Sequence, residues 1–184
     1  MSTTTVVAIV IGAAIIALLA ILILQRQRSD RLRQRFGPEY DRAVRETGST
    51  TRAESDLHRR EERVKKFNIR PLTAEDRDRF IARWTQVQAR FVDDPAGAVA
   101  DADHLIGEVM NLRGYPMADF ETAAADISVD HPQVVENYRA AHALALRQTT
   151  GQATTEDLRR AMVHYRSLFE DLAGAPAMAR AARA

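Results

Sequence analysis

The apolar stretch Val6–Leu24, VVAIVIGAAIIALLAILIL, contains no charged side chain. An α-helix rises about 1.5 Å per residue and needs roughly 20 apolar residues to cross the hydrocarbon core of a bilayer. The stretch is therefore just long enough to span a membrane once. We expect a transmembrane anchor over residues 6–24, preceded by a short tail over residues 1–5. Five arginines follow the anchor directly: Arg26, Arg28, Arg31, Arg33 and Arg35.

These arginines indicate the orientation of the anchor. Short flanks rich in Lys and Arg stay on the cytoplasmic side of a membrane. Residues 1–5 contain no basic side chain, so the pattern predicts the N-terminus outside and the C-terminal domain in the cytoplasm. A cleaved export signal would need a basic start, a shorter apolar region and a cleavage site between small residues, and these features are missing. An exported envelope protein, with the domain outside, is kept as the alternative.

Length and composition limit what the rest of the chain can be. Roughly 160 residues follow the anchor, which is enough for one soluble domain with its own core. The absence of cysteine excludes disulfides, thiolate nucleophiles and Cys-based metal sites. The net charge of +1 conceals an asymmetry. Residues 25–70 carry 14 Lys and Arg against 8 Asp and Glu, a net of +6, whereas residues 71–184 carry 12 against 17, a net of −5.

The basic segment 25–70 has two interpretations. Beside an anionic membrane leaflet each well-placed basic side chain gains on the order of 1 kcal/mol, so we expect anionic lipid headgroups as partners of this segment. The five arginines would then serve both lipid contact and topology. Nucleic-acid binding is the alternative, but the segment lacks interleaved aromatic residues and a recognisable nucleic-acid motif.

Helix-ending residues divide this segment into charged juxtamembrane helices. Gly37 and Pro38 predict the end of the first helix and the start of a second, which would reach about Glu46. Residues 51–67 are dense in charge and poor in large apolar side chains, which predicts a solvated helix rather than a core element. Pro71 interrupts that helix, because the residue before a proline avoids the helical region.

From Thr73 onward, apolar stripes at helical spacing predict an antiparallel helical bundle over residues 71–174, with Trp84 in its core. No stretch alternates apolar and polar residues as a strand would, so the expected fold class is all-α. We expect residues 175–184 to form a flexible tail. The expected bundle helices cover about residues 73–93, 95–113, 118–126, 131–148 and 155–173. The residues expected to cap or end them are Thr73, Asp94, Gly114, Thr154 or Thr155, and Gly174.

A search of the sequence for catalytic and metal-ligating patterns gives one weak candidate. Asp101, His104 and Glu108 lie on one face of a predicted helix, but a metal-binding bundle needs such residues from several helices. We therefore expect an exposed polar face there, and no metal, cofactor or catalytic residue. No nucleophile elbow and no glycine-rich phosphate loop is present in the sequence.

Aromatic, imidazole and cationic side chains recur on two helices that should be neighbours. Either their rings pack in the core with hydrogen-bonded polar tips, or they form a face that binds a partner. Both interpretations are kept open. The residues concerned are His131, Tyr138, Arg139, His142, His164 and Arg166.

Small residues in the anchor are spaced by four, Ala8 with Gly12 and Ala13 with Ala17. This spacing would let two anchors approach closely and form a homodimer.

Several motifs carry a resemblance to a known group of proteins. Together they resemble an uncharacterised family of single-pass bacterial membrane or "secreted" proteins, and the resemblance spans nearly the whole chain after the anchor. It implies a bacterial envelope protein, but it supplies no activity, ligand or catalytic residue, and the "secreted" label conflicts with the topology expected from the arginines. The motifs are Arg-Phe-Gly-Pro-Glu-Tyr at 35–40, Gly-Tyr-Pro at 114–116, Asp-His-Pro at 130–132, Asn-Tyr-Arg at 137–139, His142, Thr-Glu-Asp-Leu-Arg at 155–159 and Met-Val-His-Tyr-Arg at 162–166.

The functional hypothesis from the sequence is a non-enzymatic, membrane-anchored helical interaction module at the bacterial inner membrane. Its distal bundle would bind an unidentified protein in the cytoplasm. A membrane-tethered nucleic-acid binder and an enzyme are the rival classes. A continuous basic stripe on the folded domain would favour the first rival, and a deep pocket with converging titratable groups would favour the second.

Overall fold

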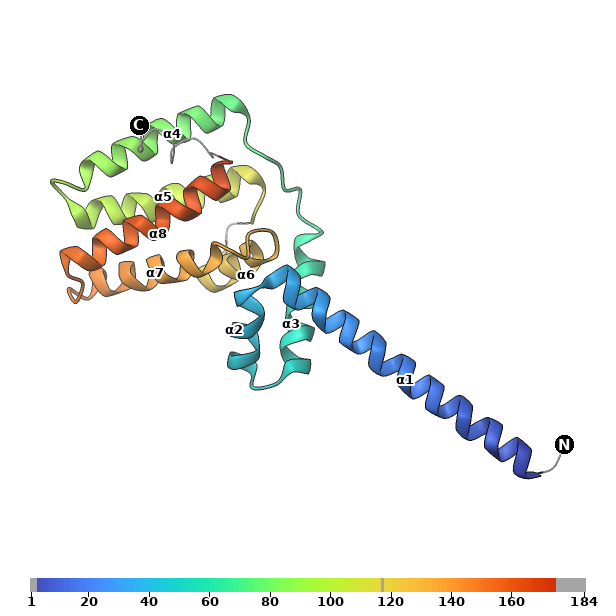
Figure 1. Cartoon of the computed structure of the whole chain (residues 1–184). Coiled ribbons are helices and arrows are strands. Elements are labelled where there is room, and N and C mark those ends of the chain that lie inside the picture. The colour runs from blue at the N-terminus through green and yellow to red at the C-terminus, as the bar shows by residue number, and fades with distance from the viewer. Residues whose placement is uncertain (1–2, 117, 175–184) are drawn as a thin grey trace, which may run out of the picture.

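The computed structural model describes residues 3–116 and 118–174, without the side chains of residues 3–11, 13, 14 and 21. Eight α-helices and no strand make up these described residues, which confirms the all-α fold class (Figure 1). The predicted tail 175–184 lies outside them. The helices are α1 (Thr3–Phe36), α2 (Pro38–Thr47), α3 (Thr50–Val64), α4 (Ala74–Arg90), α5 (Pro95–Arg113), α6 (Phe120–Asp130), α7 (Val135–Thr149) and α8 (Thr155–Ala173).

Local capping residues set the helix ends largely as expected. The Thr73 side chain accepts a hydrogen bond from the Asp76 N–H at the start of α4, and Asp94 accepts one from the Gly97 N–H at the start of α5. Thr154, rather than Thr155, begins α8 with a capping box. Gly114 and Gly174 end α5 and α8 in the left-handed conformation, and Gly37 separates α1 from α2.

Some boundaries differ from those expected. Helix α1 begins at Thr3, so residues 3–5 are helical and not part of a tail. Helix α6 covers Phe120–Asp130 rather than 118–126, because Asp119 caps its start. Its later turns bury Ile127 and Val129, which extends it. Helix α7 begins only at Val135, since residues 132–134 form a turn.

The bundle core forms between two antiparallel hairpins, α4–α5 and α7–α8, which lie side by side through α5 and α8 (Figure 1). Trp84 on α4 is fully buried and stacks on Phe169 of α8, with ring centroids 4.8 Å apart and planes 12° apart. This position confirms Trp84 as a core residue. Tyr165 is also fully buried and donates a hydrogen bond to Asp103 on α5.

A second core lies beside the bundle and corrects one expectation. The helix over residues 51–67 is not simply solvated: Ala53 and Leu57 on α3 are fully buried. The apolar residues at 53, 57 and 64 make a narrow stripe on an otherwise charged helix, so their number is too small to reveal burial in the sequence. The buried residues of the second core are Leu32, Phe36, Tyr40, Ala43, Ala53, Leu57, Val64 and Val129. Since Val129 belongs to α6, this core joins the segment 25–70 to the bundle.

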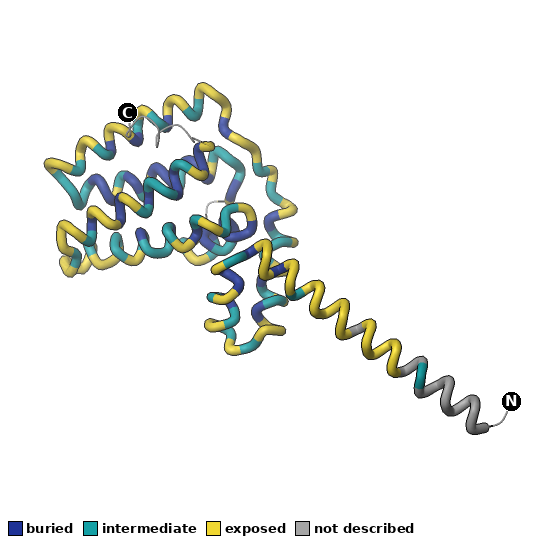
Figure 2. The backbone as a smooth tube through the Cα atoms, viewed as in Figure 1, coloured by how far each residue is buried: buried dark blue, intermediate teal, exposed yellow. Residues whose placement is uncertain are grey.

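Helix α1 extends away from the rest of the molecule (Figure 1), and its exposed surface is visible along most of its described length (Figure 2). Its described apolar side chains are largely exposed, with Ile16 at 70%. The other exposed large apolar side chains of α1 are Ile15, Leu18, Leu19, Leu22, Ile23 and Leu24. Within the described residues, no helix has a stretch that is both long and apolar enough to cross a bilayer.

Candidate functional site

The five arginines after the apolar stretch divide into two groups. Arg33 forms an ion pair with Asp41 at 3.7 Å and lies over the ring of Tyr40, and Arg35 forms one with Glu61 at 3.0 Å. These two side chains therefore contact α2 and α3 respectively. The other three are exposed and form no ion pair with a carboxylate of the described residues: Arg26, Arg28 and Arg31.

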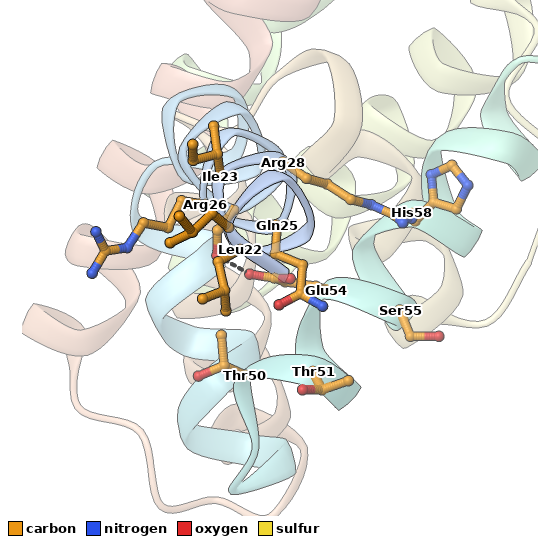
Figure 3. A pocket seen from close by; sticks show the side chains of 12 residues that line it. Leu22, Ile23, Gln25, Arg26, Arg28, Thr50, Thr51, Glu54, Ser55 and His58 are labelled. Carbon is orange, nitrogen blue, oxygen red and sulfur yellow. Dashed lines mark hydrogen bonds between the residues drawn. The ribbon is translucent and has the colours of Figure 1, made fainter. Parts of the chain in front are cut away.

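A groove of about 780 Å³ lies between α1 and α3, where the apolar stretch meets the arginines (Figure 3). Leu19, Leu22 and Ile23 line it on the apolar side. Arg26 and Arg28 line it one to two turns further along α1. Helix α3 contributes polar side chains from its first three turns: Thr50, Thr51, Glu54, Ser55 and His58.

One carboxylate, that of Glu54, lies in this groove. It already accepts hydrogen bonds from two hydroxyl groups. Oε1 of Glu54 accepts a hydrogen bond from the Tyr40 hydroxyl at 2.8 Å and another from Ser29 Oγ. Burial raises the pKa of Tyr40, and the bond to Glu54 adds to that effect. The Tyr40 hydroxyl thus remains protonated and donates to Glu54 at neutral pH, which fixes the carboxylate against α1 and α2.

A buried ionic cluster joins α2 and α3 to the bundle. Glu39 on α2 is only 1% exposed, and its Oε1 accepts hydrogen bonds from Arg60 Nη1 at 2.7 Å and Arg139 Nη2 at 3.0 Å. Arg139 on α7 also donates to Glu121 at 3.0 Å. Beside this cluster, Arg63 on α3 binds the buried Asp126 on α6. Oε2 of Glu39 has no partner among the described residues.

Three of the six predicted partner-binding residues lie around α6 and α7. Tyr138 is buried edge-on against Phe120, with centroids 4.8 Å apart. The His142 ring stacks on the Phe120 ring, with centroids 3.6 Å apart. Arg139 belongs to the Glu39 cluster. These side chains hold α6 and α7 together.

The remaining three of those six residues also have partners within the chain. His131 Nδ1 contacts Asp171, and its Nε2 lies 3.1 Å from Arg113 Nη1, so a neutral ring can donate to the carboxylate and accept from the guanidinium. His164 Nδ1 lies 2.9 Å from the Asn137 side-chain oxygen. Arg166 donates to Glu170 at 2.8 Å. His131, His164 and Arg166 thus have polar partners within the chain, whereas Nδ1 of His142 is buried without a hydrogen-bond partner among the described residues. Whether the six residues form part of the core or a partner-binding face stays a prediction.

The candidate metal face on α5 forms ion pairs with α4 instead. Arg90 donates to Asp101 at 2.6 Å, and Arg83 donates to Glu108 at 2.7 Å. His104 Nε2 lies 3.1 Å from the same Glu108. Within the described part of the chain, no three His, Cys, Asp or Glu side chains gather as a metal site would require.

The described residues thus define an all-helical bundle protein with a protruding apolar helix, three unpaired arginines at its base and a groove beside them. No family model, no curated protein and no solved structure matches the chain. The family resemblance of its motifs stays a prediction, and function has to be argued from the groove, the arginines and the packing.

Proposed function

We propose that the protein is a non-enzymatic, membrane-anchored interaction module of the bacterial inner membrane, with its bundle held in the cytoplasm for binding another protein. The observation that carries the proposal is the uncovered apolar surface of α1, which ends directly at unpaired arginines. Seven large apolar side chains of the described part of α1 are exposed. Removing each from water is worth roughly 1.5–3 kcal/mol, so together they favour an apolar environment by on the order of 10 kcal/mol.

Lipid is the environment that fits both halves of this surface. The complete run Val6–Leu24 is free of charge in the sequence, and Arg26, Arg28 and Arg31 follow it without carboxylate partners among the described residues. Apolar residues favour the hydrocarbon layer, and unpaired arginines favour anionic headgroups on the cytoplasmic side. Alternatively, a second copy of α1 could cover this apolar surface. Of the small residues that would let two copies approach closely, Ala8 and Ala13 lie outside the described side chains.

The ion pairs of the segment 25–70 favour membrane contact over nucleic-acid binding. Three arginines of this segment form ion pairs: Arg35 with Glu61, Arg60 with Glu39, and Arg63 with Asp126. Their positive charge is therefore paired with carboxylates of the same chain. Arg26, Arg28 and Arg31, next to the apolar stretch, are the arginines that we expect to contact lipid headgroups.

Reporter fusions at Ala184 test the membrane topology. We expect a fluorescent protein fused there to be bright and a periplasmic phosphatase to be inactive, because the arginine flank should be retained inside. An active phosphatase with a dark fluorescent protein would instead favour the exported alternative. Fractionation of the same cells should place the chain in the membrane pellet, and a chain lacking residues 6–24 should leave it.

A photo-crosslinker placed at Val163 tests the interaction function. Val163 is exposed within the Met162–Arg166 motif on α8, whereas Val92 is exposed on the α4–α5 turn and serves as the control position. A discrete crosslinked species from position 163 and not from 92, formed in native membranes, would support a partner on the α7–α8 face. Identical adduct patterns at both positions would count against such a face.

A further inference from the structure

We propose that the groove between α1 and α3 is a binding site for one anionic phospholipid, whose phosphate lies at the end of the groove lined by Arg26 and Arg28 and whose acyl chains follow Leu19, Leu22 and Ile23. This inference rests on the proposed function, since a bilayer lipid reaches the groove only if α1 lies in a membrane. It goes further, because it names a defined site and a ligand class in place of diffuse attraction to a charged surface.

The order of side chains along the groove matches the order of groups in a phospholipid. Leu22 and Ile23 are about half exposed and turn apolar surface toward the groove. Arg28 follows Leu22 by six residues, which is about 9 Å along a helix. Figure 3 shows the Arg28 side chain reaching toward His58 on α3, above the level of Leu22. A ligand in this groove meets hydrocarbon first and positive charge roughly one headgroup length further on.

The charge in the groove favours an anion. Arg26 and Arg28 have no carboxylate partner among the described residues, while Glu54, the acid in the lining, is tied to Tyr40 and Ser29. The hydroxyl group of Ser55, on the same helix as His58, can donate to a phosphate oxygen. The groove volume of about 780 Å³ is within the range of roughly 300–1,000 Å³ that ligand sites occupy.

Arg31 provides a matched control within the same helix. It is exposed and, among the described residues, unpaired, like Arg26 and Arg28, but it does not line the groove. A diffuse electrostatic attraction would treat the three arginines alike. A defined site requires Arg26 and Arg28 and is indifferent to Arg31.

The test uses the full chain, purified in a neutral detergent and titrated with dioleoyl phosphatidylglycerol or dioleoyl phosphatidylcholine in mixed micelles, with bound lipid counted by native mass spectrometry. We expect one phosphatidylglycerol per chain for the wild type and for Arg31→Gln. The double variant Arg26→Gln/Arg28→Gln should bind roughly tenfold more weakly or worse. Ser55→Trp, which fills the groove without changing its charge, should also lose the bound lipid.

Several outcomes would overturn the inference. Equal weakening by Arg31→Gln and by the double variant would mean diffuse attraction, and equal retention of phosphatidylcholine would remove the role of charge. Displacement of the lipid by millimolar inorganic phosphate would assign the groove to a soluble anion. Membrane fractionation stays independent of all these results: a chain that remains in the pellet but fails the titration loses only the groove assignment, whereas a chain absent from the pellet loses the membrane proposal.

Discussion

Glu39 on α2 and Arg139 on α7 are 100 residues apart in the sequence, and their side chains are joined by a hydrogen bond of 3.0 Å between Nη2 and Oε1. Both side chains are largely buried, with exposed fractions of 1% for Glu39 and 12% for Arg139. The contact connects the helices next to the apolar stretch with the distal bundle. The molecule beyond the apolar stretch therefore behaves as one packed body, and the predicted boundary at residue 70 is crossed by direct contacts.

Replacing Glu39 by Gln should lower the free energy of unfolding by about 3 kcal/mol. Removing one member of a buried ion pair leaves the partner charge uncompensated, which costs roughly 3–5 kcal/mol. We expect the lower end because Asp56 and Glu121 still neutralise Arg60 and Arg139. Urea unfolding of the full chain in detergent measures the change. The exposed Glu46, which pairs with Arg42, supplies the control Glu46→Gln, whose effect should stay below about 1 kcal/mol.

Truncating Trp84 to Ala should cost about 3–5 kcal/mol, since the ring is fully buried and stacked on Phe169. The same unfolding measurement applies. Val92→Ala is the control, because Val92 is 83% exposed and its removal should leave stability within about 0.5 kcal/mol of the wild type. A Trp84→Ala protein that melts like the wild type would contradict the core assignment.

A fragment covering residues 71–184 should be helical but less stable than one covering residues 29–184. The shorter fragment uncovers Val129, removes Arg63 from Asp126 and separates Arg139 from Glu39. Circular dichroism during heating measures this difference, and a dye that binds exposed apolar surface should bind the shorter fragment more strongly. Equal melting temperatures would mean that the second core adds nothing to the bundle.

Stability should fall in acid partly through Asp94. The hydrogen bond from the Gly97 N–H, assisted by Arg90, lowers the pKa of Asp94 below its ordinary value of 3.8. A lowered pKa in the folded state means that this contribution is complete above the unfolded pKa and is lost as the pH falls through the folded pKa. Asn at position 94 keeps a capping oxygen but cannot be protonated in this range.

The loss of melting temperature between about pH 5 and pH 2.5 should therefore be smaller for Asp94→Asn than for the wild type. At neutral pH the variant should be slightly less stable, because Arg90 loses one of its two carboxylates. Asp93→Asn removes the same charge one residue earlier without touching the cap, and should keep the wild-type pH slope. Parallel curves for wild type and Asp94→Asn would show that the cap does not titrate.

The sequence predicts those features that depend on near neighbours in the chain. Thr73, Asp94 and Gly114 act within one helical turn, so their roles follow from local spacing. Trp84 was placed in the core by the apolar stripe around it. These signals need no knowledge of which helices meet.

Features that depend on tertiary contacts were missed or left open. Nothing in the motif that contains Glu39 indicates that its carboxylate is buried, because its arginine partners come from α3 and α7. The same limit applies to the five arginines, which look alike in the sequence: Arg33 and Arg35 differ from the others only through Asp41 and Glu61. The groove arises where α1 and α3 diverge, which no local pattern encodes.

Helix α1 is unbroken from Thr3 to Phe36, and Leu32 and Phe36 are fixed in the second core. Twelve residue steps separate Leu24 from Phe36, or about 18 Å of helix, so the distance from the end of the apolar stretch to the Phe36 end of the second core is set. The orientation of the bundle around the axis of α1 is fixed as well. One residue inserted between Leu24 and Leu32 would turn the whole bundle by about 100° around the helix axis. Four inserted residues would return it to within about 40° of its original direction but about 6 Å further along the axis.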